Sequence, residues 1–414
     1  MGEKHKRAYD VVIAGGGMVG ASLAVALARL DLKLALVEAV PLEHSGQPSF
    51  DDRMIVLSRG SRRILDSLAV WSGIGERSWP IHKIHVSQQG RFGSAVIDGA
   101  EQGIGELGAL VSARLLGEAL WARIKQLDAI DVFCPGRLVR VQPCADHVTA
   151  TLESEDAEDS IAAKLVTVVD GARSGLRGQL GVSANIKSYG QTAIVGNVGI
   201  DARWSGHVAY ERFTPHGPMA LLPGRDNTCT FVLTRPAELA PTAMALHDAA
   251  FLQLLQDAFG YRLGRFGRLG ARQAYPLHLV TAERVTAERA VIVGNAAHGL
   301  HPVAGQGFNL GLRDVATLAE ILADRMRNSE ASMDVGAPEL LELYRKWRYR
   351  DQHNVVAFTD GLIRLFDIPS NAAAVARGFG LLAFDMLPGA KRVLAHHTMG
   401  LSGTLTRLAR GLPL

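Results

Sequence analysis

A glycine-rich turn near the start of the chain constrains the fold more than any other feature. Tyr9 to Ala14 (YDVVIA) is an apolar run that predicts a short buried strand, and Gly15-Gly16-Gly17-Met18-Val19-Gly20 follows it directly. An Ala- and Leu-rich stretch then predicts a helix to about Leu30. Strand, GxGxxG turn and helix in this order are typical of a unit that binds a nucleotide pyrophosphate at the helix N-terminus.

An acidic residue at the end of the second predicted strand strengthens this interpretation. The run Lys33 to Val37 (KLALV) is followed by Glu38, where a carboxylate can accept hydrogen bonds from both ribose hydroxyls of an adenosine. In the turn, Gly15, Gly17 and Gly20 serve a tight bend, a close approach to pyrophosphate and a close helix-to-strand contact. The sequence therefore predicts a dinucleotide site rather than a bare structural turn.

Composition excludes several classes of protein. The 414 residues are 48% hydrophobic and 21% charged, which describes a globular chain long enough for two domains. Forty-four basic and 41 acidic residues leave a net charge of +3 without a long basic run, so nucleic acid is not expected as a partner. Cys134, Cys144 and Cys229 are scattered, which favours a reducing compartment and argues against a disulfide scaffold or a thiolate metal site.

The N-terminus superficially resembles a secretory signal, because Lys4, Lys6 and Arg7 precede an apolar stretch from Val11 to Ala28. We reject that interpretation, since the glycine turn divides the stretch and cleavage near Ala28 would remove the nucleotide site. No other run approaches the roughly 20 apolar residues of a membrane span. We therefore expect a cytoplasmic protein that is soluble or peripheral on the inner face of the cytoplasmic membrane.

Two later stretches also predict a buried strand followed by a loop suited to a ligand. Leu165 to Val169 is followed by Asp170-Gly171, a pair that by itself is often only a turn. Ala290 to Val293 leads into a glycine-rich loop and a helix whose N-terminus offers unpaired N–H groups, so we expect a negatively polarised cofactor there. Residues 188–276 change to β segments with turns, which predicts an inserted antiparallel sheet.

Three dispersed blocks carry a resemblance to a known family: GGGMVG with Glu38, VVDGARSGLR, and GNAAHGLHPVAGQGFNLGLRD. Together they resemble the flavin-dependent aromatic hydroxylases of the p-hydroxybenzoate hydroxylase type, whose members carry the GxGxxG, DG and GD motifs in this order. The runs FDDRMIVLS, AYERFTPHGPMALLP and HTMGLSG look most like the ubiquinone-biosynthesis ring hydroxylases, and within them the 2-polyprenyl-6-methoxyphenol branch.

The resemblance implies FAD as the cofactor. The cofactor-binding residues that it assigns are Gly15, Gly17, Gly20, Glu38, Arg53, Arg114, Asp170, Asn295, Pro302, Gly305, Gly307 and Asn309. The two arginines would serve the FAD phosphate and ribityl region, Asp170 would link FAD binding to nicotinamide access, and residues 301–309 would line the pyrimidine edge and the oxygen-reacting face. The sequence departs from the family at Gly294-Asn295, where Asp is usual. Asn keeps a carbonyl acceptor but loses the charge.

The fold class implied is α/β, a Rossmann-like FAD-binding domain with an inserted antiparallel β-sheet substrate domain and C-terminal helices. We expect the FAD-binding domain in residues 1–80, 101–187 and 277–330. The substrate domain would comprise residues 81–100 and 188–276, and the C-terminal helical region residues 331–414.

The resemblance also implies a reaction. NAD(P)H would reduce FAD as a transient co-substrate, since only one GxGxxG is present, and O2 would react to a flavin C4a-hydroperoxide that hydroxylates a polyprenylated phenol. Alternatives are a sister hydroxylase acting at another ring carbon, a flavoprotein reductase or oxidase, and a non-catalytic assembly subunit. A ubiquinone-biosynthesis complex is an expected partner. No catalytic base can be assigned, because Arg212, Arg272 and Tyr275 on the expected substrate sheet fit exposed or core-packing roles equally well.

Two further patterns have competing interpretations. His298 and His301 have the i, i+3 spacing of a metal pair, but no third ligand accompanies them, so a loop-ordering role is favoured. The C-terminal stripe with Phe379, Met386 and their apolar neighbours beside Lys391 favours core packing, and a membrane-facing or partner-facing surface is the alternative.

Overall fold

The fold is described from a computed structural model of the 414-residue chain. It describes residues 7–41, 53–154, 158–201, 207–327 and 334–414. Phe50, Asp51 and Asp52, which belong to one run of the family resemblance, lie outside the described residues.

The first sheet carries the glycine-rich turn. Its main path runs β18-β19-β11-β1-β2-β8, and the pairs joining β19, β11, β1, β2 and β8 are parallel. Strand β1 is central and its residues 11–13 are fully buried, which explains the unbroken apolar run in the sequence. The strands are β1 (Arg7–Ala14), β2 (Leu34–Val37), β8 (Ile130–Phe133), β9 (Arg137–Pro143), β10 (Val148–Glu153), β11 (Glu158–Val168), β18 (Thr286–Ala287) and β19 (Ala290–Ile292).

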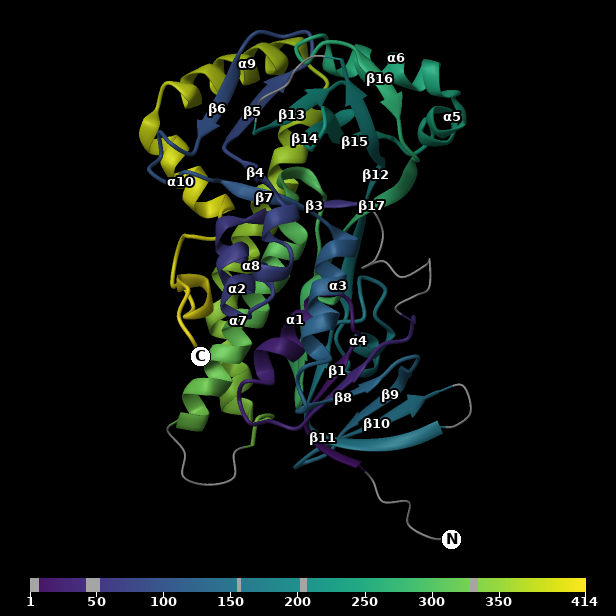
Figure 1. The fold of residues 1–414 in the computed structure, drawn as a ribbon, viewed down its shortest axis with the longest axis vertical. Coiled ribbons are helices and arrows are strands. Elements are labelled where there is room, and N and C mark those ends of the chain that lie inside the picture. Colours follow the sequence, from purple (N-terminus) through teal and green to yellow (C-terminus); the bar gives the residue numbers. More distant parts are fainter. Residues whose placement is uncertain (1–6, 42–52, 155–157, 202–206, 328–333) are drawn as a thin grey trace.

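A second sheet, in the order β20-β17-β12-β15-β14-β13-β5-β6, lies at the opposite end of the molecule (Figure 1). Its neighbouring strands are antiparallel except β5 and β13, which are parallel and are joined through a long stretch of chain. Its strands are β5 (Lys83–Gln88), β6 (Ser94–Asp98), β12 (Ala184–Ile200), β13 (Val208–Thr214), β14 (Gly217–Pro223), β15 (Thr228–Pro236), β16 (Phe266–Leu269), β17 (Gln273–Ala282) and β20 (His298–Gly299).

The two faces of the second sheet pack against different parts of the molecule. The outer face packs Ile194, Leu221 and Phe231 against α6, with α5 beside it. The inner face turns toward the first domain, where Phe213 packs with Val303 and Ile363. The helices are α5 (Ala240–Ala245) and α6 (Asp248–Phe259). Side chains along β13 therefore alternate between a helix-covered face and a face directed at the nucleotide-binding half.

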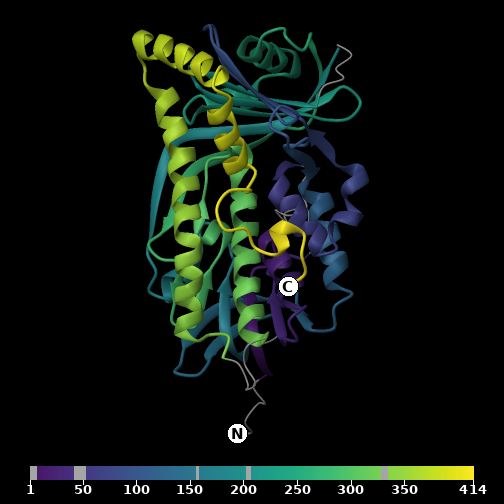
Figure 2. The same ribbon diagram turned by 90° about the vertical axis from the view of Figure 1, so that its left-hand side faces the viewer.

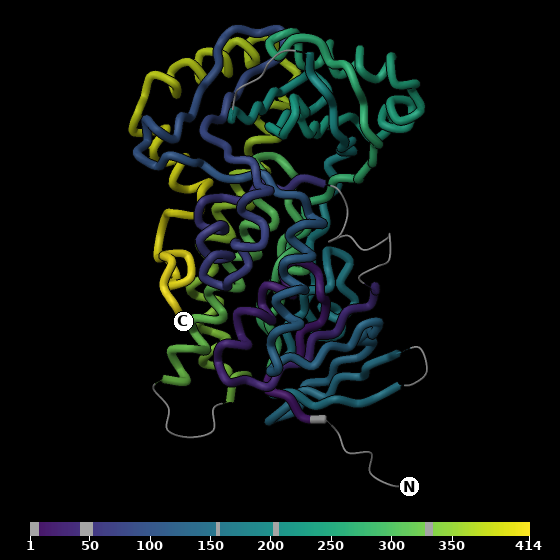
Figure 3. The backbone as a smooth tube through the Cα atoms, viewed as in Figure 1, coloured from purple at the N-terminus to yellow at the C-terminus, as the bar shows by residue number. Residues whose placement is uncertain are grey.

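Helices and a small sheet join the two halves. The three-stranded sheet β3-β7-β4 lies between the larger sheets, and the tube in Figure 3 shows the chain passing repeatedly between the two ends. The elements of this middle layer are β3 (Met54–Ser58), β4 (Trp79–Ile81), β7 (Gly108–Ser112), α1 (Met18–Leu27), α2 (Arg59–Ser67), α3 (Ala113–Ile124) and α7 (Gln306–Arg327). Helix α4 (Gly175–Gln179) packs on β9 of the first sheet. Within the described ranges, short 3-10 turns lie at Trp71–Gly73, Gly75–Arg77, Gly294–Ala296, Val303–Gly305 and Leu408–Arg410.

Three C-terminal helices complete the molecule: α8 (Pro338–Asp367), α9 (Asn371–Asp385) and α10 (Pro388–Thr398). Figure 2 shows α8 running beside α7 along the length of the molecule. The core-packing interpretation of the C-terminal stripe is wrong for Phe379 and Met386, which are 59% and 73% exposed, and holds for Phe384, which packs against a small core. Within the described ranges, no helix combines the length and apolarity needed to cross a bilayer.

Candidate active site

The glycine-rich turn is shaped so that side chains are excluded from it. Gly15 has a φ of +113°, and a Cβ there would lie 2.7 Å from the carbonyl oxygen of Val169. A Cβ on Gly20 would overlap the carbonyl oxygen of Gly15. Gly17 is the N-cap of α1 in an extended conformation, with no side chain over the helix end. The first N–H groups of α1 are therefore open to an anion such as pyrophosphate.

Glu38 lies at the end of β2, against this turn. One carboxylate oxygen accepts from the backbone N–H of Gly16 at 2.6 Å, and the other accepts from Val40 at 2.8 Å. Glu38 is only 8% exposed, so these bonds hold its position rigidly. Each oxygen keeps a second lone pair, which leaves acceptor capacity for a ribose hydroxyl.

The three sequence motifs meet in space although they are far apart in the chain. The Cα of Asp170 would lie 3.2 Å from a Cβ on Gly15, so the DG motif adjoins the glycine turn. Val19, inside the GxGxxG, would contact a Cβ on Gly294 at 3.3 Å and one on Gly311 at 3.0 Å. The glycine turn, the Gly294-Asn295 pair and α7 thus form one continuous wall.

The remaining predicted polar residues lie around this wall. The Arg53 guanidinium lies 4.8 Å from the ring centroid of Tyr275 on β17, which ties the first half to the substrate sheet. Arg114 is exposed in the first turn of α3. Asp170 is exposed, and partial desolvation raises its pKa while a hydrogen bond with Ser174 opposes the rise. Asn295 is exposed beside buried neighbours, as a residue facing a ligand would be.

The loop before α7 has a strained backbone. Ala304 has a φ of +59° without being glycine, and Gly305 has the same φ. A left-handed non-glycine residue costs on the order of 1–2 kcal/mol, so the surrounding contacts must hold it there. Pro302 is exposed, and no heavy atom lies within 4 Å of a Cβ built on Gly307. Space therefore lies open beside Gly307 in the first turn of α7, where a planar ring system would fit.

Asn309 holds this loop in place. Its Oδ1 accepts from the Ser58 backbone N–H at 2.9 Å, and its Nδ2 donates to the carbonyls of Val56 at 2.9 Å and Gly305 at 2.7 Å. Both amide hydrogens are therefore used within the protein. Asn309 joins α7 to β3 and contributes to the site by positioning the loop.

His301 also orders the loop, as its sequence context predicts. Its Nδ1 accepts from the Val303 backbone N–H at 3.1 Å, which makes Nδ1 the unprotonated nitrogen, and its ring packs edge-on against Tyr189 at 5.2 Å. Burial lowers the pKa of His301 to about 4, so the ring is neutral at physiological pH. Among the residues that the structure describes, the buried His298 Nδ1 and His301 Nε2 have no hydrogen-bond partner.

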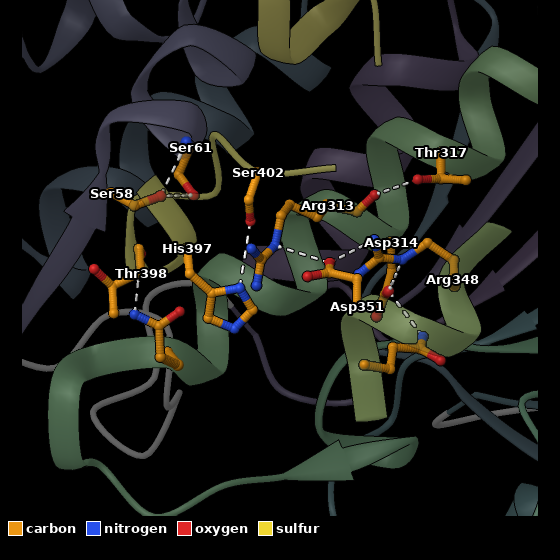
Figure 4. Close-up of polar contacts among 12 residues, drawn as sticks. Ser58, Ser61, Arg313, Asp314, Thr317, Arg348, Asp351, His397, Thr398 and Ser402 are labelled. Carbon is orange, nitrogen blue, oxygen red and sulfur yellow. Dashed lines mark hydrogen bonds and ion pairs between the residues drawn. The ribbon is translucent and has the colours of Figure 1, made fainter. Parts of the chain in front are cut away.

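A buried ionic network fixes α7 against α8 (Figure 4). Asp314 Oδ1 accepts from Arg348 Nε at 2.6 Å and from Gln352 Nε2 at 2.9 Å. Asp351 lies 2.7 Å from Arg348 and 3.3 Å from Arg313. Burial raises the pKa of Asp351, but these two guanidinium groups outweigh it and the net shift is downward. The network sets the position of α7, whose N-terminus faces the site.

Across the site, one carboxyl group stands on an apolar wall. Glu211 on β13 faces inward, because its neighbour Arg212 donates to the carbonyl of Ala258 on the outer side. Its register partners are Val86 on β5 and Ala220 on β14. The other inner-face positions of these three strands carry Ile84, Gln88, Ala209, Phe213, Pro218 and Leu222. Within the part of the chain that the structure describes, Glu211 is thus the only ionisable residue at these positions.

Burial raises the pKa of Glu211 to about 8, and a backbone hydrogen bond from the strained Ala304 opposes the rise. Glu211 is of intermediate exposure, and its hydrogen bond with Ala304 places it against the loop before α7. Sequence reasoning missed Glu211. The alternation of side chains along AYERFT predicts that Glu211 and Arg212 lie on opposite faces of the strand. Which of the two faces inward is known only from the structure, where α6 packs on the outer face.

This arrangement fits a flavin-binding protein. The open cradle at Gly307, the excluded side chains at Gly15 and Gly20, and the acceptor at Glu38 fit FAD extended from the glycine turn to the N-terminus of α7. The chain belongs to the FAD binding domain family, which it matches over residues 8–359. It is a flavin-dependent aromatic monooxygenase.

Comparison with known proteins supports the same assignment. The chain is 37% identical over 408 residues to the ubiquinone hydroxylase UbiL of Rhodospirillum rubrum, covering 98% of this chain and 93% of that protein. It is 28% identical to the 3-demethoxyubiquinol 3-hydroxylase of Escherichia coli, covering 95% and 98%. The crystal structure of the p-nitrophenol 4-monooxygenase PnpA from Pseudomonas putida superposes with a TM-score of 0.79 at 18% identity, covering 96% and 99%, which shows a shared fold.

Proposed function

We propose that this protein hydroxylates the ring of a polyprenylated phenol in ubiquinone biosynthesis, with NAD(P)H as a transient electron donor and O2 as the source of the oxygen atom. Two of the relatives named above are called a ubiquinone hydroxylase and a 3-demethoxyubiquinol 3-hydroxylase. The single observation that carries the proposal is the apolar inner wall with one carboxyl, which accepts a hydrogen bond from Ala304 in the loop before α7.

The chain's own residues have three tasks in this reaction. FAD, when bound, supplies the activation of O2, which no amino-acid side chain can perform. The N-terminus of α7 places its N–H groups toward negative charge on the ring system. The apolar wall around Val86, Ala220 and Phe213 excludes water and accepts an apolar ring. Glu211 then has the position to take the proton from the phenol hydroxyl.

A carboxyl group with a pKa of about 8 is suited to that proton transfer. A general base is most effective when its pKa lies near the working pH, and removal of the phenol proton makes the ring a better nucleophile. For Glu211→Gln we expect kcat to fall about 100-fold with little change in KM, because the amide keeps a hydrogen bond but cannot take the proton. In the parent enzyme kcat/KM should rise with pH through about 8.

Glu238→Gln, at an exposed position just before α5, is the matched control and should leave kcat and KM unchanged. A Glu211→Gln variant that retains the kcat and the pH profile of the parent would remove Glu211 from the reaction.

The hydroxylase assignment is tested with purified holoenzyme, NAD(P)H and 18O2. Mass spectrometry should find one 18O atom in the phenol product. Consumption of NAD(P)H without labelled product would favour a reductase or oxidase, and a colourless protein without flavin absorbance would favour an assembly subunit. Extraction of the quinone intermediate that accumulates in a deletion strain would identify the ring carbon.

The proposal also includes location and partners. A polyprenylated phenol partitions into a bilayer, so the enzyme needs peripheral contact with the inner face of the cytoplasmic membrane or with a complex that presents the substrate. Cell fractionation at low salt should recover the protein with membranes or with co-purifying pathway proteins. Recovery of all of it as a soluble, isolated protein would count against both.

A further inference from the structure

The outward side of α9 is a helix face without charge. Its exposed residues are Asn371, Ala372, Val375, Ala376, Phe379, Gly380, Leu382 and Ala383. A surface helix normally turns its charged residues to solvent and its apolar residues to the core. In α9 the order is reversed, because its buried residues are the small Ala374 and Gly378.

The apolar face continues beyond the end of α9. Met386 and Leu387 follow in the next turn, 73% and 57% exposed, and Val393 on α10 is 72% exposed. We call Val375, Phe379, Leu382, Met386, Leu387 and Val393 the C-terminal apolar surface. Six large side chains exposed within residues 375–393 exceed the scattered exposure of a typical soluble surface, and such a cluster marks a binding surface.

The inner side of α9 is held firmly, so this surface cannot fold back on itself. A Cβ on Gly378 would lie 2.6 Å from the carbonyl oxygen of Phe92, so helix and β-hairpin touch backbone to backbone. Asp385 accepts from the Val96 N–H on β6 at 2.8 Å. Phe384 packs into a small core with Ile97. The inner contacts of α9 therefore do not shield its apolar outward face, which is available to a partner.

Charges around the C-terminal apolar surface favour an anionic binding partner. Two exposed cations border the surface: Arg392 beside Val393, and Arg91, which donates to Asn371 Oδ1 at 2.5 Å at the start of α9. Arg377 lies between Asn371 and Arg392 in the chain and donates to the neutral carbonyls of Leu365 and Ile368, so within residues 364–393 these three charges face one exposed acid, Asp367. The other bases of residues 364–393 are engaged: Arg364 pairs with Asp360, and the buried Lys391 lies beside Glu101 and Asp385. A second copy related by two-fold symmetry would bring the same cations together. Anionic lipid headgroups neutralise them, and each basic residue near such a surface contributes about 1 kcal/mol.

The surface is continuous with the proposed substrate wall. Helix α9 packs on β6 and β5, and β5 pairs with β13, which carries Glu211. At the end of α8, just before α9, Phe366 stacks on Phe213 with ring centroids 3.5 Å apart. A bilayer under α9 would thus lie against the sheet that forms the apolar wall.

We propose that the C-terminal apolar surface docks the enzyme on an anionic lipid bilayer, with α9 lying in the interface and the substrate sheet beside it. This inference rests on the proposed function for its purpose, the capture of a membrane-borne polyprenylated phenol, but its binding step is independent of catalysis. An amphipathic helix of this kind binds through buried apolar area and attraction to anionic lipid.

The test is flotation of the holoenzyme with vesicles of phosphatidylcholine alone or mixed with phosphatidylglycerol. We expect binding to the mixed vesicles that weakens as salt is raised. The double variant Phe379→Ser with Met386→Ser should lower the partition coefficient about tenfold or more. The matched control is Leu343→Ser with Tyr349→Ser, two exposed large side chains on α8, which should bind like the parent.

Turnover separates docking from folding and from chemistry. Phe379→Ser with Met386→Ser should keep its FAD content and its rate on a short-chain, water-soluble phenol, and lose rate only on a long-chain phenol presented in vesicles. Parent enzyme that turns over the soluble phenol but does not float overturns the docking proposal. Flotation without hydroxylation of any phenol overturns the proposed function and leaves docking intact. A dimer that the double variant dissociates, without vesicle binding by the parent, would assign the surface to a second copy instead.

Discussion

Replacing Asn309 by Ala should destabilise the protein by about 2–5 kcal/mol. The substitution removes three hydrogen bonds of a side chain that is 2% exposed. Ser58 is buried, so its N–H loses its partner in a dry environment and bears the full penalty of about 1–3 kcal/mol. Val56 and Gly305 are partly exposed, so water can reach their carbonyls and each adds about 0.5–1 kcal/mol.

Thermal unfolding followed by circular dichroism measures this loss. For a chain of 414 residues, a change of this size corresponds to a fall in Tm of about 2–6 °C. Asn309→Asp should be worse than Asn309→Ala, because a buried carboxylate would face the carbonyl oxygens of Val56 and Gly305. Asn354→Ala, at an exposed position on α8, is the matched control and should stay within about 0.5 kcal/mol of the parent.

The flavin-free protein decides between two roles of Asn309. If the amide positions the loop, the Tm of the flavin-free protein falls as much as that of the holoenzyme, and FAD retention on gel filtration falls with it. An unchanged Tm of the flavin-free protein together with weaker FAD binding would refute this reasoning, because it would mean that the amide binds the cofactor directly.

Two further predictions concern the glycine turn and the buried histidine. Gly20→Ala should abolish FAD retention, because the new Cβ would overlap the carbonyl oxygen of Gly15. Gly178→Ala is the control and should keep bound flavin, because there is open space around Gly178. Equal flavin content in both variants would contradict the assignment of the turn to FAD. The pKa of His301 is lowered to about 4 in the folded state, below its unfolded value of about 6.5, so stability present at pH 7 is lost as the pH falls through that window. Between pH 7 and pH 5, the free energy of unfolding measured in urea should fall by about 2 kcal/mol less in His301→Asn than in the parent. The same pH dependence in both proteins would rule out His301 as the source of that loss of stability.

Much of the nucleotide half could be predicted from sequence because its signals are local. The GxGxxG turn lies directly between its strand and its helix, and Glu38 follows the next strand, so a short window contains all the geometry that matters. His301 ordering its own loop is equally local, since its partner Val303 is two residues away.

The inner wall and the helix α9 could not be predicted in the same way. The alternation along β13 separates Glu211 from Arg212, but the burial of each face depends on α6, about 40 residues later in the chain. The stripe of α9 has the periodicity of a core-facing helix, and only its placement on β6 shows that the large side chains point outward. A hydrophobic pattern specifies a face but not what lies against it.

The sequence by itself thus determined the α/β class, the dinucleotide turn and the kinship of the chain, because short-range backbone geometry and glycine placement impose them. The tertiary structure determined the role of individual residues. It engaged the amide of Asn309 with β3, more than 250 residues away in the chain, raised the pKa of Glu211 by enclosing it in an apolar wall, and left α9 uncovered. The reason is physical: hydrogen-bond satisfaction, desolvation and burial depend on neighbours that folding brings from distant parts of the chain.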